Sequence, residues 1–131
     1  MNNVKVTAKI QNLDKLTRNG RLYTEEALKG AFNNRIFMEQ NENNSIPIFT
    51  EDGELIGRAH CSLEYPTINI DGVINDRFAY VLDGACLTHS GCGHLEYDAD
   101  KGMQIVTDYK LRELLLSSHA YVDCSMEVVK K

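Results

Sequence analysis

The sequence predicts an α+β protein in which strands dominate and two helices accompany them. Apolar and polar residues alternate over residues 4–10 and again over residues 120–129, which is the period of a strand with one buried face. Residues 25–38 and 108–118 instead carry apolar residues at helical spacing. The 131 residues suffice for one hydrophobic core, so we treat 1–131 as a single domain.

The first predicted helix, over residues 25–38, follows a turn and a cap. Asn19-Gly20 is a turn dipeptide that supplies positive φ at little steric cost. Thr24 occupies the N-cap position, and Glu25 and Glu26 place negative charge where a helix N-terminus favours it. The side of this helix that should face the core carries Ala27, Leu28, Ala31, Phe32 and Ile36.

The middle of the chain predicts short strands separated by turns and loops. We expect an Asn-rich loop over 39–45, strands over 46–49, 55–63 and 67–70, a turn at Asp71-Gly72, a long apolar stretch over 78–87, a tight loop over 89–94 and a strand over 103–106. Pro47 suggests an edge strand or a strand beginning.

The second predicted helix, over 108–118, rests on Leu111, Leu114 and Leu115. In the last strand, Ser125 should face outward because its apolar neighbours occupy the even positions. The residues that we expect to be buried are Val6, Ile10, Leu28, Phe32, Ile48, Val81, Leu111, Leu115, Val122, Met126 and Val128.

Composition and charge restrict the function classes. The formal net charge of -5 argues against a nucleic-acid surface, which would need a basic stripe. No apolar run approaches the roughly 20 residues that span a bilayer, and the N-terminus has no signal-peptide pattern. We therefore expect an intracellular protein that binds neither nucleic acid nor membrane, with its four cysteines as reduced thiols.

A family resemblance begins at the turn before the first helix. The run Asn19-Gly20-Arg21-Leu22-Tyr23, followed by a helix with Glu-x-x-Leu, resembles the NGRxYP segment of tailed-phage prohead proteases, which share the herpesvirus assemblin-like serine protease fold. Ile56-Gly57-Arg58-Ala59, residues 79–85 and the strand carrying Ser125 follow in the order of that family. The resemblance, over roughly residues 15–129, implies a mostly antiparallel, barrel-like sheet. Thr24 departs from it, because the family usually has Pro there.

The resemblance implies Ser125 as the nucleophile, but it does not supply the whole catalytic set. The family places its general-base histidine where this chain has Thr50, Glu51 and Asp52, and His60 is the nearest alternative. Carboxylates at positions 123 and 127 flank Ser125 and would oppose a developing oxyanion. The sequence ends six residues after Ser125, so we expect either a truncated chain or a relative that no longer cuts.

The function that we expect is that of a phage or prophage protein with a non-catalytic prohead-protease-like domain, acting in capsid assembly or protein binding. Its partner would be capsid protein, scaffold protein or a second copy of the chain, which would make a homo-oligomer. It would work in the cytoplasm of an infected or lysogenic bacterium or inside an immature capsid. One alternative is an active capsid-maturation serine endopeptidase with Ser125 as nucleophile and His60 as base. Another is an unrelated α+β protein in which these matches are accidental.

One cluster of metal-ligating residue types is present. Cys86, His89, Cys92 and His94 fall within nine residues, and such side chains can hold zinc. Their spacing matches no zinc pattern that we can name, and Cys86 is explained more simply as a small core residue. We therefore expect no metal and no cofactor, with zinc in this loop as the weaker alternative.

Overall fold

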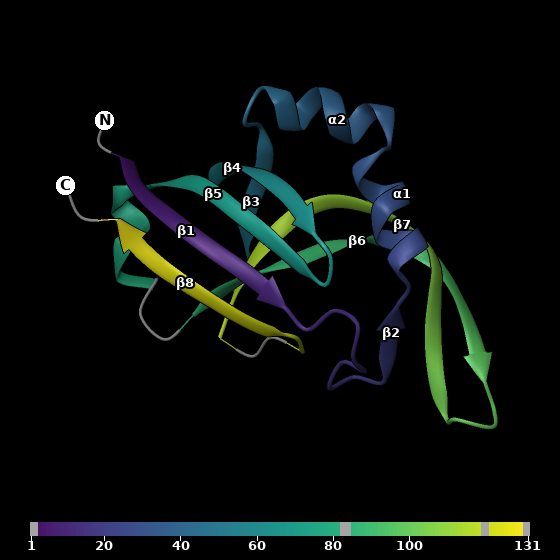
Figure 1. Ribbon diagram of the computed structural model, residues 1–131. Coiled ribbons are helices and arrows are strands. Elements are labelled where there is room, and N and C mark those ends of the chain that lie inside the picture. The colour runs from purple at the N-terminus through teal and green to yellow at the C-terminus, as the bar shows by residue number, and fades with distance from the viewer. Residues whose placement is uncertain (1–2, 82–84, 119–120, 130–131) are drawn as a thin grey trace.

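The computed structural model describes residues 3–81, 85–118 and 121–129, and these residues form the predicted α+β architecture (Figure 1). In chain order the elements are β1 (Asn3–Gln11), β2 (Arg21–Tyr23), α1 (Glu25–Phe32), α2 (Arg35–Glu42), β3 (Ile46–Thr50), β4 (Leu55–Glu64), β5 (Thr67–Asn75), the 3-10 helix η1 (Asp76–Val81), β6 (Cys86–Asp98), β7 (Met103–Ser117) and β8 (Asp123–Val129). No helix among the described residues is long and apolar enough to cross a membrane.

All the strands belong to one eight-stranded sheet. Its order is β2-β7-β3-β4-β5-β1-β8, and β6 pairs with β7. Among the described residues, five of the seven strand pairings are antiparallel, and only β2 and β3 run parallel to β7. The sheet curls into a half-barrel (Figure 1). The barrel-like character that the sequence predicts is therefore present, and β8 pairs with β1 within it as expected.

The hydrophobic core contains most of the residues predicted for it. Val6, Ile10, Leu28, Ile48, Leu111 and Val122 are buried, and Phe32 and Met126 are partly buried. Leu115 is only half-buried, and Val128 is 42% exposed near the end of the last described strand. The side chain of Val81 and the first residue of the predicted strand over 120–129 lie outside the described residues.

The predicted helix over 25–38 is two helices, α1 and α2, separated at Asn33-Asn34. The Oδ1 atom of Asn34 accepts hydrogen bonds from the backbone N–H groups of Ile36 (3.1 Å) and Phe37 (3.2 Å), so Asn34 is the N-cap of α2. The restart changes which residues face the core: Phe37 is buried and Ile36 is 69% exposed. The expected Asn-rich loop over 39–45 is correspondingly shorter, because α2 continues to Glu42.

The predicted cap of the first helix is confirmed. The Thr24 hydroxyl accepts from the Ala27 N–H at 3.1 Å and lies 3.2 Å from the Val106 carbonyl oxygen, to which it donates. Thr24 therefore ties α1 to β7 as well as capping it.

Replacing Thr24 with alanine should lower the free energy of unfolding by roughly 0.5–2 kcal/mol, because the N-terminus of α1 loses its cap. Urea denaturation of Thr24→Ala and Thr24→Ser measures the effect. The serine variant keeps the hydroxyl and should stay close to wild type. Equal losses in the two variants would mean that the hydroxyl is not what matters.

The predicted helix over 108–118 is wrong, because these residues belong to strand β7. The ladder between β6 and β7 pairs Ser90 with Glu113 and Gly91 with Leu111, which leaves Arg112 as the extra residue of a β-bulge. The bulge puts Leu111 and Leu114 on the same buried face three residues apart. That spacing imitates a helix, which is why the pattern misled the prediction.

Three further predictions are wrong because strands β5 and β6 are longer than expected and the 3-10 helix η1 was not expected. The expected turn at Asp71-Gly72 lies inside β5, where a Cβ on Gly72 would come within 3.0 Å of the Cβ of Ala59. A larger residue at position 72 would require its neighbours on β4 to shift, so glycine favours the close packing of the two strands. The tight loop expected over 89–94 is part of β6, and the family-like strand over 79–85 begins inside η1, with residues 82–84 outside the described part.

The expectation of four reduced thiols is also wrong. Cys86 of β6 and Cys124 of β8 form a disulfide with a Cα–Cα distance of 6.2 Å, while Cys61 and Cys92 are free. The two bonded cysteines are 38 residues apart, and the curl of the sheet brings their strands together. Sequence spacing alone could not show this, because it depends on how the sheet closes.

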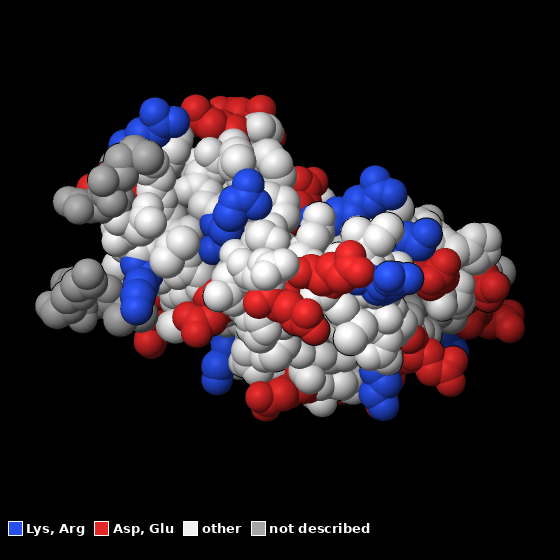
Figure 2. Space-filling model, turned by 90° about the horizontal axis from the view of Figure 1, so that it is seen from above, with Lys and Arg blue, Asp and Glu red and all other residues white. Residues whose placement is uncertain are grey.

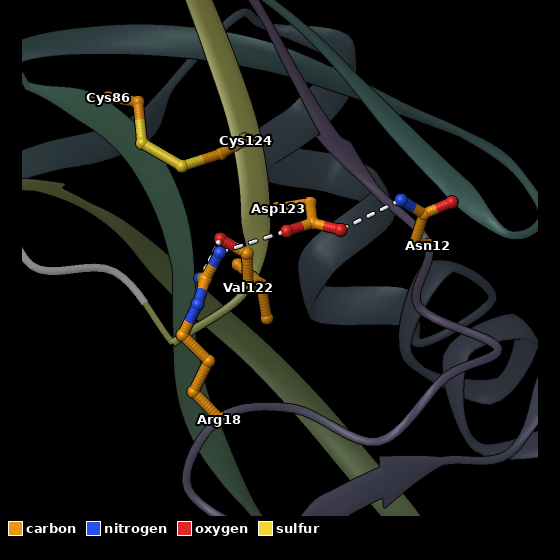
Figure 3. A network of polar contacts seen from close by, with 6 residues as sticks. All are labelled: Asn12, Arg18, Cys86, Val122, Asp123 and Cys124. Atoms are coloured by element: carbon orange, nitrogen blue, oxygen red, sulfur yellow. Dashed lines mark hydrogen bonds and ion pairs between the residues drawn. A yellow bond between two sulfur atoms is a disulfide. The ribbon is translucent and has the colours of Figure 1, made fainter.

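A network of hydrogen bonds lies beside the disulfide (Figure 3). The Arg18 guanidinium donates to the Val122 carbonyl oxygen at 3.1 Å and to Asp123 at 3.0 Å, and the Asn12 amide donates to the second oxygen of Asp123 at 2.8 Å. The backbone N–H of Arg18 donates to the Tyr121 carbonyl oxygen at 2.9 Å. These contacts hold the segment between β1 and β2 against the start of β8.

Candidate functional site

The structure does not bring Ser125 and His60 together. Ser125 lies on β8 opposite Lys9 of β1, and His60 lies on β4 opposite Asp71 of β5. Strands β5 and β1 therefore separate the two side chains. Three strand spacings amount to about 14 Å, far beyond the hydrogen-bond reach that a nucleophile and its base require.

Both residues line an open cavity of about 600 Å³ on one face of the sheet. The strand pairing sets polar residues beside one another there, with Asp71 next to His60 and Lys9 next to Ser125. Ser125 and Lys9 are exposed to solvent. This face has the character of a solvated sheet surface rather than an enclosed catalytic site.

The weaker zinc alternative fails on geometry. Cys86, His89, Cys92 and His94 all lie along the extended strand β6, and Cys86 is bound in the disulfide. Eight residues of strand span about 26 Å, so the first and last of the four cannot share one ion. Within residues 3–81, 85–118 and 121–129, no group of three or more histidine, cysteine or acidic side chains is placed to hold a metal.

A different cavity collects the residues of the family-like motif. We call it the motif pocket; its volume is about 370 Å³. Asn19, Arg21 and Tyr23 line it together with Thr17, Glu51, Thr88, His89, Leu115, Ser117, Tyr121 and Val122.

The turn before β2 positions the motif side chains. The Gly20 N–H donates to the Thr17 carbonyl oxygen at 3.0 Å, and Gly20 has the positive φ of 82° that the sequence predicts. The Arg21 N–H donates to the Thr17 hydroxyl at 3.0 Å, and the same hydroxyl contacts the amide oxygen of Asn19. Thr17 is buried, so it fixes the turn from the inside. Strand β2 then runs parallel to β7 and carries Tyr23 into the core.

His89 lies at the centre of an aromatic cluster beside the pocket. Its ring contacts Tyr23 edge to face at a centroid distance of 4.8 Å and Tyr109 at 5.6 Å, and the two tyrosines are 5.3 Å apart. Burial lowers the pKa of His89 to about 4, so the imidazole is neutral at pH 7. Its Nδ1 atom is buried and has no hydrogen-bond partner among the described residues.

Arg21 supplies positive charge beside this cluster. Burial raises the pKa of the Tyr23 hydroxyl, and the neighbouring Arg21 guanidinium partly offsets that rise by charge and by a side-chain hydrogen bond. Arg21 forms no ion pair with any described carboxylate. It also lines a second cavity of about 350 Å³, which shares Tyr23 and His89 with the motif pocket.

Among the residues that the structure describes, the pocket contains binding groups, and no hydrogen-bonded pair of nucleophile and base is recorded there. Arg21 and Asn19 offer hydrogen-bond donors, and Leu115 and Val122 provide apolar wall. Of Thr50, Glu51 and Asp52, which stand where the resemblance implies a histidine, Glu51 lines the pocket, and a carboxylate does not reproduce that base. Because His89 Nδ1 has no partner among the described residues, it lacks the carboxylate that orients the histidine of a Ser-His-Asp triad.

The family resemblance supplied three of the eleven described residues that line this pocket. The motif residues Asn19, Arg21 and Tyr23 came from the family resemblance, and all three line it. Thr88 and Ser117 were missed, because the first falls between the apolar stretch over 78–87 and the loop over 89–94, and the second was placed in a helix. The alternation of Leu87, His89 and their neighbours was the available signal for a strand, but two glycines at positions 91 and 93 suggested a loop.

Acidification should destabilise the protein through His89. Folding lowers the pKa of this imidazole from about 6.5 to about 4. The stability that the neutral imidazole contributes to the folded state is therefore fully present above pH 6.5 and is lost as the pH falls toward 4. Urea denaturation at pH 4.5 and pH 7 should show a smaller loss for His89→Gln than for wild type. His94→Gln, at an exposed position on the same strand, should behave as wild type. Equal losses of unfolding free energy in all three proteins would contradict a His89 imidazole that is neutral in the folded state.

The face seen in Figure 2 intersperses positive and negative side chains, with no continuous field of one sign. The chain thus presents no basic stripe on that face. Comparison with protein-family models, with characterised proteins and with solved structures finds no match.

Proposed function

We propose that this chain is a non-catalytic, prohead-protease-like protein of a phage or prophage that binds capsid or scaffold protein during assembly. The observation that carries the proposal is the gathering of Asn19, Arg21 and Tyr23 at the motif pocket, away from Ser125 and His60. The residues of the family-like motif thus line one cavity, while Ser125 and His60 are separated by strands β1 and β5.

The half-barrel supports the assemblin-like part of the proposal. Its sheet is mostly antiparallel, and the Ser125 strand pairs within it as the resemblance implies. Among the described residues no histidine lies beside Ser125, which supports the non-catalytic part: the residue opposite it is an exposed lysine, and Asp123 is engaged by Arg18. A serine hydroxyl without an adjacent base is a weak nucleophile at neutral pH.

Treatment with an active-site-directed serine reagent should leave Ser125 unlabelled, because no described histidine lies within reach of its hydroxyl to activate it. Intact mass and peptide mapping measure the adduct, and an authentic serine protease serves as the positive control. Stoichiometric labelling of Ser125 that His60→Ala abolishes would establish the endopeptidase alternative instead.

The binding part of the proposal is tested by co-expression. The tagged chain is produced with the capsid and scaffold proteins encoded by the same phage, and the complexes are purified under non-reducing conditions so that the disulfide stays intact. We expect one of the two proteins to co-purify uncleaved. Recovery of the chain alone from cells that contain both would contradict the proposal.

A further inference from the structure

We propose that the motif pocket binds a carboxylate group presented by the protein partner, with Arg21 as the anchoring cation. This inference rests on the proposed binding function and specifies the chemistry of the site. The carboxylate would come from an acidic side chain or from the C-terminus of a chain.

The first argument is the unpaired charge of Arg21. The side chain is only partly exposed, and its guanidinium lies near the Tyr23 hydroxyl, a phenol whose pKa burial raises. The ion pairs of the described residues all lie elsewhere, between Arg18 and Asp123, Lys29 and Glu25, and Arg35 and Glu39. A partly desolvated guanidinium without a counter-ion favours an anion, and a carboxylate matches its planar donor pattern.

The second argument is the unsatisfied hydrogen-bonding capacity beside Arg21. His89 lines the same pocket, and its buried Nδ1 atom has no partner among the described residues. Buried polar atoms are nearly always paired in proteins, so this wall of the pocket is incompletely satisfied by the described residues. The neutral imidazole adds no positive charge, which leaves Arg21 as the cation among the described residues of the lining. The Asn19 amide and the Thr88 hydroxyl supply further donors on the lining.

The third argument comes from Glu51, the other charged residue of the lining. It is exposed and forms no ion pair with Arg21. An incoming carboxylate would therefore meet attraction from Arg21 and weaker, solvent-screened repulsion from Glu51. This opposition predicts that removing the Glu51 charge strengthens binding and that removing the Arg21 charge weakens it strongly.

The experiment uses three small probes that differ only in where a carboxylate lies. N-acetylglutamic acid α-amide has a side-chain carboxylate, N-acetylglutamine has a terminal carboxylate, and N-acetylglutamine amide has neither. Each is titrated into the isotope-labelled chain at pH 7 and followed by NMR. We expect saturable shifts at Arg21, Tyr23, Thr88 and His89 with one or both carboxylate probes and none with the neutral probe, and the stronger carboxylate identifies the source. Equal responses to all three probes would overturn the proposal.

Matched variants locate the charge that matters. Arg21→Gln should weaken binding by about tenfold or more, and Glu51→Gln should strengthen it by about twofold to fivefold. Arg58→Gln removes an exposed cation that lies outside the motif pocket and should leave binding unchanged. Unchanged binding by an Arg21→Gln protein whose NMR spectrum is otherwise folded would also overturn the proposal.

Failure of this inference can be told from failure of the proposed function. If capsid or scaffold protein co-purifies equally well with wild type and Arg21→Gln, the partner is real and the carboxylate site is wrong. If neither protein co-purifies while the carboxylate probes still bind through Arg21, the site stands and the proposed partner is wrong.

Discussion

Replacing Cys124 with serine should lower the free energy of unfolding by about 4 kcal/mol. The disulfide closes a loop of 38 residues between β6 and β8, and constraining the unfolded chain over such a loop is worth about 4 kcal/mol. Urea denaturation under non-reducing conditions measures the change. Cys86→Ser should cause the same loss, because either substitution removes the bond.

Two controls separate the bond from the substitution. Cys92→Ser removes an exposed free thiol and should leave stability unchanged. Adding a reductant should lower the stability of wild type toward that of Cys124→Ser and should not affect that variant. Titration of four free thiols in the unreduced, denatured wild-type protein would contradict the disulfide.

Leu114→Ala should cost about 2–5 kcal/mol, whereas the neighbouring Leu115→Ala should cost clearly less. Leu114 is fully buried on one face of β7, and Leu115 is half-buried at the motif pocket. Denaturation of the two variants side by side measures the difference. A helix over 108–118 would bury both residues on one side and predict similar losses, so equal costs would contradict the strand.

The elements with regular alternation could be predicted from the sequence. β1 keeps its buried residues at Val6, Ala8 and Ile10 without interruption, and β4 has nearly the predicted bounds. β7 could not be predicted in the same way. Its bulge inserts Arg112 as an extra residue, so the buried residue that follows Leu111 is Leu114 rather than residue 113. The two-residue period of the strand is therefore broken where the helix was predicted.

Contacts that depend on the curl of the sheet could also not be predicted from the sequence. Cys86 and Cys124 meet because β6 and β8 approach each other, and no spacing rule joins residues so far apart. The motif pocket has the same origin, because Arg21 precedes His89 by 68 residues and the two line one cavity through strands β2 and β6, which both pair with β7. The outward direction of Ser125 was predictable from alternation, but its distance from His60 required the strand order.

The most direct test compares the motif pocket with the Ser125 face in one co-expression experiment. Wild type, Arg21→Gln and Ser125→Ala are each produced with the capsid and scaffold proteins of the same phage, and the co-purified partner is quantified. Our account predicts that Ser125→Ala retains the partner and that Arg21→Gln loses most of it. Loss of the partner in Ser125→Ala together with full retention in Arg21→Gln would contradict it and would move the functional site to the outer face of the sheet.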